Sequence, residues 1–178
     1  MNDAGGMAER LQAAMFERRL VMLAGEVDPA RAGDVVASLL TLDALGDEPI
    51  DLRVDAHSDS LDAAFSIMDA IESLGVPVRV LCSGSVSGTL VGLLAVAEGR
   101  VIASHARIRL CEPRDSFGGR ASDVAARAAH ERQRLELFQR RLAERTGHAL
   151  EHIEADMLAG RYLNAEQARG YGLVDAVL

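Results

Sequence analysis

The chain has 178 residues, the length of one domain, and it contains no apolar run of the roughly 20 residues that a membrane-spanning helix needs. Its net charge of −8 argues against nucleic-acid binding, which requires a basic face, so we expect neither nucleic acid nor membrane as a partner. The N-terminus lacks the pattern of a secretory signal. We therefore expect a cytoplasmic protein.

Residue usage also limits the chemistry. All 19 basic residues are Arg, which excludes Schiff-base lysines and Ser-Lys dyads. Cys82 and Cys111 are too few for a disulfide framework, and no His or Cys has zinc-finger spacing. We expect no metal and no cofactor.

Short apolar runs alternate with helical stretches, which predicts an α/β domain with a sheet of parallel type. Asp28 and Pro29 mark the start of the first helix, and Gly75 follows the end of the second. An apolar helix over 89–97 should be buried, and Asn164 with Gln167 forms a capping box for a last short helix. The predicted strands span 19–24, 50–54, 78–82, 100–103, 106–111 and 172–178.

The stretch SGSVSGTLVG, residues 83–92, runs from a predicted strand into the apolar helix. Serine hydrolases often place their nucleophile on such a turn, because a helix N-terminus stabilises negative charge. Ser85 and Ser87 are therefore candidate nucleophiles. Alternatively, and more commonly for Ser before an apolar helix, they cap the helix end.

A long charged helix is predicted from about residue 122 to 146, closing at Gly147. It would be nearly 40 Å long at about 1.5 Å per residue, which is long for a helix lying on so small a domain. Its narrow apolar stripe includes Val124, Leu135 and Phe138. The helix is either a solvated surface helix or a protruding handle that packs against a second copy.

Several segments resemble the Clp protease proteolytic subunit (ClpP) family from about Met15 to Leu178. The most specific is RYLNAEQARGYGLVD; FERRLVMLAGEVD, EPRDSFGGRASDV and RLAERTGHALEHIEADM are also similar. The resemblance implies a crotonase-like ββα spiral in residues 15–178, with a handle segment at about 112–147 and a short extension over 1–14. It also implies heptameric rings that stack through their handles into a barrel of serine-peptidase sites.

The resemblance places none of the family's catalytic side chains in this sequence. The nucleophile position is Val86 in an ungapped match, or Gly88 if the following turn is shorter. Cys111 stands at the histidine position and Gly160 at the aspartate position. Ser58 and Asp59 replace the two glycines of the oxyanion hole, where an acidic side chain would repel a developing oxyanion. We therefore expect no catalytic residue at these positions and no peptidase chemistry.

Two rearranged sites stay open. Ser87, one residue from the ungapped nucleophile position, could be activated by His57 with Asp59 nearby, giving an active serine hydrolase. Cys111 could itself be a nucleophile, although a small buried strand residue is the simpler interpretation. His105 lies on the same predicted strand as Cys111, about 20 Å away, which is too far to replace the missing histidine. His130, His148 and His152 are interpreted as solvated.

The partner prediction follows from the same resemblance. The family docks an ATPase through an apolar pocket with tyrosines, and Asp51 and Arg53 stand in their places. Docking of a Clp ATPase by this subunit alone is therefore doubtful. We expect a catalytically inactive structural or regulatory subunit of a homomeric ring, or of a ring mixed with an active ClpP paralogue. The alternatives are the Ser87 hydrolase and a crotonase-like acyl-CoA enzyme, for which the sequence carries no specific signature.

Overall fold

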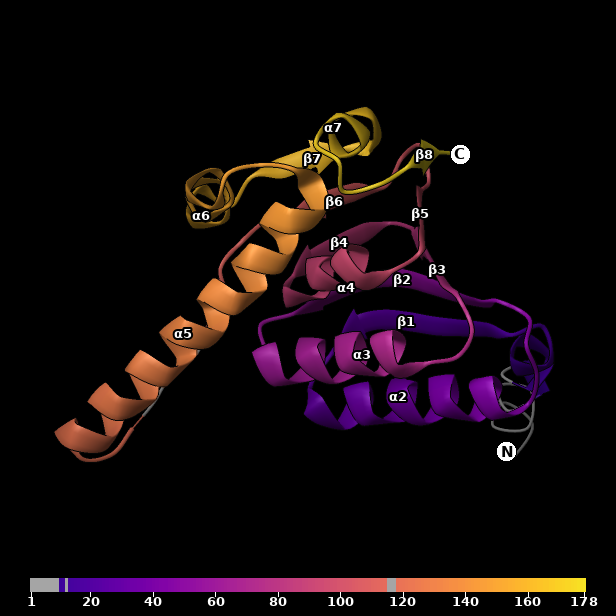
Figure 1. The fold of residues 1–178 in the computed structure, drawn as a ribbon, viewed down its shortest axis with the longest axis horizontal. Helices are drawn as coiled ribbons and strands as arrows, with labels where there is room; N and C mark the ends of the chain where they lie inside the picture. Colours follow the sequence, from indigo (N-terminus) through magenta and orange to yellow (C-terminus); the bar gives the residue numbers. More distant parts are fainter. Residues whose placement is uncertain (1–9, 12, 115–117) are drawn as a thin grey trace, which may run out of the picture.

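A computed structural model describes residues 10, 11, 13–114 and 118–178. It confirms the α/β class: a central sheet packs on helices, and one long helix projects away from the body (Figure 1). The strands are β1 (Leu20–Glu26), β2 (Ile50–Ser58), β3 (Val78–Cys82), β4 (Ser85–Gly88), β5 (Gly99–Ile102), β6 (Arg107–Arg109), β7 (Tyr162–Asn164) and β8 (Ala176–Val177). The helices are α2 (Pro29–Ala44), α3 (Leu61–Ser73), the 3-10 helix η1 (Thr89–Gly92), α4 (Leu93–Val96), α5 (Ala121–Thr146), α6 (Leu150–Ala159) and α7 (Ala165–Gly170).

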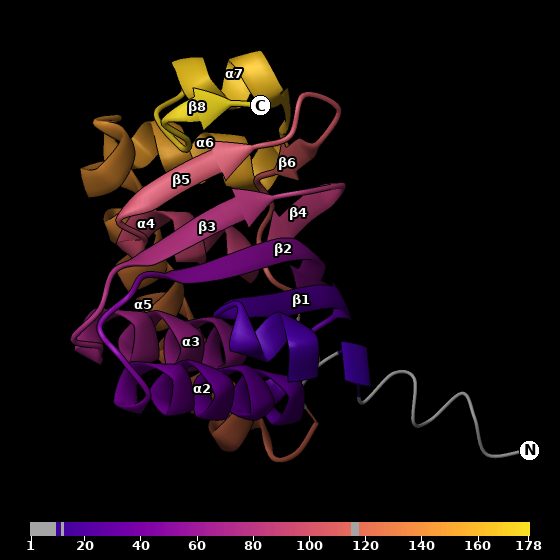
Figure 2. The same ribbon diagram turned by 90° about the vertical axis from the view of Figure 1, so that its right-hand side faces the viewer.

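Strand β2 is the centre of the sheet, and the sheet branches from it. One edge of β2 pairs with β1, while the other pairs first with β3 and then, beyond a turn at 83–84, with β4. One branch continues through β5 to β8 and the other through β6 to β7. Seen from the side, β1, β2, β3 and β5 follow one another with α4 and α5 behind them (Figure 2). The predicted parallel pairing is confirmed except between β6 and β7, which are antiparallel.

The helix ends predicted from local sequence are confirmed. The Asp28 side chain accepts the Arg31 N–H at 2.8 Å, with Pro29 at the first helical position. Asn164 and Gln167 form the reciprocal capping box at 2.9 Å in each direction. Helix α5 ends at Gly147, whose φ of 76° is left-handed.

The predicted strands over 50–54, 106–111 and 172–178 have the wrong extent, and β4 was not predicted as a strand. Of the residues in 172–178, only Ala176 and Val177 form β8, because only they pair with β5. Strand β2 continues to Ser58, because Val54, Ala56 and Ser58 are buried while the alternate residues lie on the exposed face. Residues 85–88 form β4 instead of a turn, because β2 and β6 offer them backbone partners on both sides. Strand β6 is only three residues long, so His105 lies in a turn before it and Cys111 follows it.

The described residues contain no helix that is long and apolar enough to cross a membrane. The predicted buried helix over 89–97 is instead η1 followed by α4, and both are buried from Thr89 to Leu94. This short pair forms the surface on which the long helix rests.

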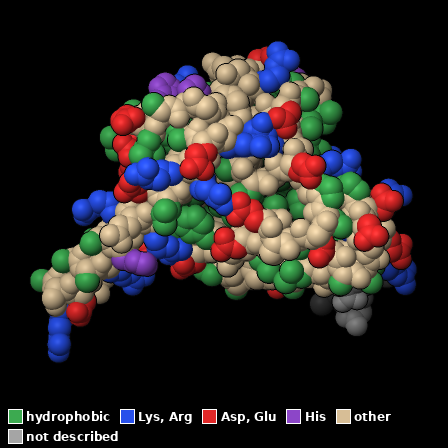
Figure 3. Space-filling model, in the orientation of Figure 1, with side chains coloured by type: hydrophobic (Ala, Val, Ile, Leu, Met, Phe, Trp, Pro, Cys, Tyr) green, Lys and Arg blue, Asp and Glu red, His purple; other side chains and the backbone are tan. Residues whose placement is uncertain are grey.

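Helix α5 is a handle anchored at its C-terminal half. Phe138 is fully buried, lies edge-on to Phe65 with ring centroids 6.3 Å apart, and packs against Gly92, where a Cβ would collide with the Phe138 ring. Arg134 pairs with Asp62 at 2.6 Å. Figure 3 shows apolar side chains where the handle meets the body and charged ones along the projecting part. The N-terminal half protrudes, as the handle interpretation predicts, and its packing against a second copy stays a prediction.

Phe138→Ala should therefore loosen the handle from the body. It removes a buried aromatic side chain and leaves a cavity, which typically costs about 3–5 kcal/mol. Leu137→Ala, on the same turn but with Leu137 59% exposed, is the matched control and should cost less than about 1 kcal/mol. Urea unfolding of both variants checks this, and equal losses would contradict the anchoring role of Phe138.

The C-terminal strand is fastened by one ion pair. Asp175 accepts the backbone N–H of Arg100 at 2.9 Å and pairs with its guanidinium, whose Nη1 donates to the Gly172 carbonyl at 2.6 Å. Burial disfavours the charged form of Asp175, but the hydrogen bonds and charge of Arg100 outweigh it and lower the pKa of that carboxyl below its usual value. The pair couples β5 to the segment before β8.

This coupling predicts a pH-dependent effect of Asp175→Asn. A lowered pKa stabilises the fold above the unfolded-state pKa, and that contribution is lost as the pH falls through the folded-state pKa. The variant should therefore be less stable than wild type at neutral pH, and the difference should shrink below about pH 4. Urea unfolding at both pH values measures it. Asp47→Asn, at an exposed position, is the control. A stability difference between Asp175→Asn and wild type that persists in acid would contradict the lowered pKa of Asp175.

Candidate functional site

The sheet register brings Ser87 and His57 together. His57 and Ser87 are direct partners in the parallel pairing of β2 with β4, so both side chains leave the same face of the sheet. His57 Nδ1 lies 3.0 Å from Ser87 Oγ. The pair stands at the carboxyl ends of two parallel strands, the edge at which open α/β sheets bind ligands.

Asp59 completes a three-residue chain. Its Oδ2 lies 3.3 Å from His57 Nε2, and the side chains of His57 and Asp59 are 41% and 36% exposed. One neutral tautomer satisfies both contacts: Nε2–H donates to Asp59, and the Nδ1 lone pair accepts the Ser87 hydroxyl proton. The arrangement has the order of a Ser-His-Asp triad with the two ring nitrogens exchanged. The rearranged site considered from the sequence is thus geometrically assembled.

The alternative role of these serines, capping the following helix, is wrong. Gly88 is the N-cap of η1, and no side chain there makes a capping hydrogen bond. Ser85 lies in β4, where its backbone N–H donates to Asp55 at 2.8 Å. Because 85–88 is a strand, its side chains alternate between the two faces of the sheet instead of bending toward the helix end.

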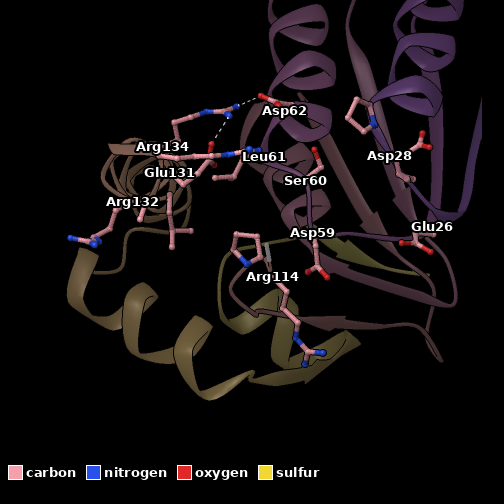
Figure 4. A pocket seen from close by; sticks show the side chains of 16 residues that line it. Glu26, Asp28, Asp59, Ser60, Leu61, Asp62, Arg114, Glu131, Arg132 and Arg134 are labelled. Atoms are coloured by element: carbon pink, nitrogen blue, oxygen red, sulfur yellow. Dashed lines mark hydrogen bonds and ion pairs between the residues drawn. The ribbon is translucent and has the colours of Figure 1, made fainter. Parts of the chain in front are cut away.

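A cavity of about 580 Å³ adjoins this site between the body and the handle. Its walls come from the β1–α2 connection, from residues 59–62 and from α5. Figure 4 shows Asp59 and Arg114 on one side of it and Arg134, joined to Asp62 and Glu131, on the other. Acidic and basic side chains line it together, so it has no single strong charge.

The family model described as Clp protease matches residues 4–178. The chain belongs to the Clp protease family. The mixed α/β fold with its central sheet agrees with that membership, and the resemblance of the separate segments is confirmed at the level of the family.

Neither of the two residues that the sequence resemblance assigns to the nucleophile position carries a hydroxyl. Val86 is 1% exposed, with its side chain in the core. Gly88 has a φ of 67°. A Cβ at Gly88 would overlap the Ser58 carbonyl oxygen and would lie 3.0 Å from His57 Cε1. The backbone therefore leaves no space for a side chain at Gly88.

The positions that the resemblance assigns to the catalytic histidine and aspartate hold Cys111 and Gly160, which form no acid–base pair. Cys111 is half-buried and unpaired in a disulfide, directly after β6. Gly160 caps α6 with φ 67°, and a Cβ there would stand 3.1 Å from Arg109 Nη2. The Arg109 guanidinium, which lies 5.0 Å from the Tyr162 ring centre, occupies the space beside Gly160.

Both residues that the resemblance assigns to the oxyanion hole have other partners, Ser58 in the backbone and Asp59 in the His57 side chain. The Ser58 hydroxyl is buried; it donates to the Val27 carbonyl at 2.6 Å and accepts the Ser60 N–H at 3.1 Å. Asp59 directs its carboxylate to His57. A carboxylate beside a reacting carbonyl would destabilise an oxyanion.

One further sequence interpretation changes. His148 is half-buried instead of solvated, and its ring stacks on that of His152 with centroids 4.7 Å apart. His152 is exposed, as expected, and its Nε2 lies 3.2 Å from Asp156 Oδ2. His130 is exposed, as expected. Cys82 is fully buried, and burial raises the pKa of its thiol to about 12, so it is not a nucleophile. The described residues hold no cluster of three or more His, Cys, Asp or Glu that could bind a metal ion.

Gly88→Ala tests the close approach at the nucleophile position. The alanine must adopt a positive φ, at about 1–3 kcal/mol, and must also displace the Ser58 carbonyl. Gly25→Ala is the control, since Gly25 has φ 81° with nothing within 4 Å of a Cβ. We expect Gly88→Ala to lose at least about 2 kcal/mol more in chemical denaturation than Gly25→Ala. Equal losses would mean that Gly88 has room for a side chain.

Proposed function

We propose that this chain is a structural or regulatory ring subunit of the Clp type that lacks the family's peptidase chemistry. The observation that carries the proposal is the closed space at Gly88, where a nucleophilic side chain would collide with the Ser58 carbonyl. Cys111 and Gly160 supply neither the base nor the acid of the triad. Loss of several triad members leaves only the residual catalysis of substrate binding.

Ring formation is the second part of this proposal. Family membership supports it, and the protruding half of α5 supplies an extended surface for a second subunit. Val124 and Ala128 on this half are half-buried within the subunit, while its other residues are polar, charged or small. The ring would contain copies of this chain alone or copies mixed with an active paralogue.

Docking of an unfoldase ATPase is proposed to be weak or absent. A cavity of about 420 Å³ on the exposed sheet face has an apolar floor that includes Leu81 and Val101. Asp51 and Arg79 form a two-point ion pair at its wall, at 2.7 and 3.0 Å. An apolar side chain entering there would have to desolvate charged groups, which costs free energy.

The purified protein tests the loss of peptidase chemistry and the formation of a ring. We expect no hydrolysis of fluorogenic peptides above buffer, alone or with a Clp ATPase, and a ring stoichiometry in native mass spectrometry. Peptide hydrolysis that Ser87→Ala abolishes would overturn the loss of peptidase chemistry. A monomer that also fails to enter rings of an active paralogue would overturn the role as a subunit.

A further inference from the structure

The contact between Ser87 and His57 has no part in the proposed scaffold function. We propose that Ser87 is an acyl acceptor for activated esters, at a site separate from the family's triad positions. The substrate class is aryl esters of short carboxylic acids. This activity goes beyond the proposed function, which concerns ring assembly and the absence of peptide hydrolysis.

The hydrogen-bond geometry supplies the activation. Serine is a weak nucleophile unless a base accepts its proton, and His57 Nδ1 is placed 3.0 Å from Ser87 Oγ to do so. Asp59, 3.3 Å from Nε2, holds the ring in the tautomer whose Nδ1 is free to accept, and it stabilises the imidazolium that forms. His57 would act as the base and Asp59 as its positioning residue.

The location gives a substrate access. His57 and Asp59 are each more than one third exposed, and Asp59 lines the 580 Å³ cavity. Ser87 itself is half-buried on the exposed face of the sheet. Neither Ser87 nor His57 lines that cavity, so a short acyl group would approach the Ser87 hydroxyl from the solvent side of the sheet.

The reaction is an acyl transfer followed by hydrolysis. Ser87 Oγ bonds to the acyl carbon as its proton passes to His57 Nδ1, and the bond between that carbon and the phenol oxygen breaks. The phenolate leaves and takes up the proton from His57, which returns the ring to its neutral form. Water then attacks the acyl-serine, gives a proton to His57 and releases the carboxylic acid, and Ser87 regains its proton.

The surroundings restrict the substrate to esters with good leaving groups. Amide hydrolysis needs strong stabilisation of the oxyanion, and the oxyanion positions here hold the engaged Ser58 hydroxyl and the Asp59 carboxylate. A phenolate departs without that assistance. Peptides would stay intact while aryl esters react.

Covalent labelling tests the proposal. The full chain is treated with a fluorophosphonate and, separately, with p-nitrophenyl acetate, and adducts are located by intact-mass and peptide mass spectrometry. We expect one adduct at Ser87, with labelling at least roughly 100-fold slower in His57→Gln, because general-base catalysis contributes that much. Asp59→Asn should slow labelling less and change its pH profile.

Ser85→Ala is the matched control, because Ser85 lies two residues away on the same strand and contacts Asp55 through its backbone instead of its hydroxyl. It should label like wild type. Three results would overturn the proposal: no adduct at Ser87, an adduct at Ser85, or equal labelling of wild type and His57→Gln. The contact between Ser87 and His57 would then be only a hydrogen bond between two strands. None of these results depends on ring assembly or on peptide hydrolysis, so they are distinguishable from a failure of the proposed function.

Discussion

The close contact between the ends of β2 and β4 is the constraint on which the rest of the structure depends. Gly88 lies directly against the Ser58 carbonyl, and the buried Thr89 hydroxyl reaches the carbonyls of Ser58 and Ser60 at 3.2 and 2.9 Å. The Ser58 hydroxyl in turn holds Val27. Three connections are thus fixed around one point: the end of β1, the start of α3 and the start of η1.

This contact determines both the architecture and the chemistry. The contact directs the chain into η1 and α4. Phe138 packs on these two short helices, and this packing anchors the handle on the body. The contact also removes the space for a side chain at Gly88. The strand register that produces this contact places Ser87 beside His57. The proposed loss of peptidase chemistry and the proposed ester chemistry are therefore two consequences of the same packing.

Local signals in the sequence predicted the features that depend on neighbouring residues. The caps at Asp28, Asn164 and Gly147 are examples, since each depends on residues within one helical turn. Strand β4 was missed because Gly and Ser around residue 85 resemble a turn, and only tertiary pairing with β2 and β6 makes it a strand. The alternation of buried and exposed residues in 54–58 could have extended β2, but Asp55 and His57 resembled loop residues.

The candidate site was predictable in part for the same reason. Sequence identified Ser87, His57 and Asp59 as residues that could meet, because each lies near a family position. Their contact depends on the pairing register of two strands 30 residues apart, which no local pattern specifies. The capping role for the serines failed because Gly88 separates them from the helix.

The ring nitrogens of His57 provide the most direct measurement of this account. A long-range ¹H–¹⁵N NMR spectrum of the histidine side chains, recorded at neutral to mildly alkaline pH, distinguishes the two neutral tautomers. The account predicts Nε2–H with an unprotonated, hydrogen-bonded Nδ1, and a change at Nδ1 in Ser87→Ala. An Nδ1–H tautomer, or a tautomer mixture that is the same in both proteins, would contradict it.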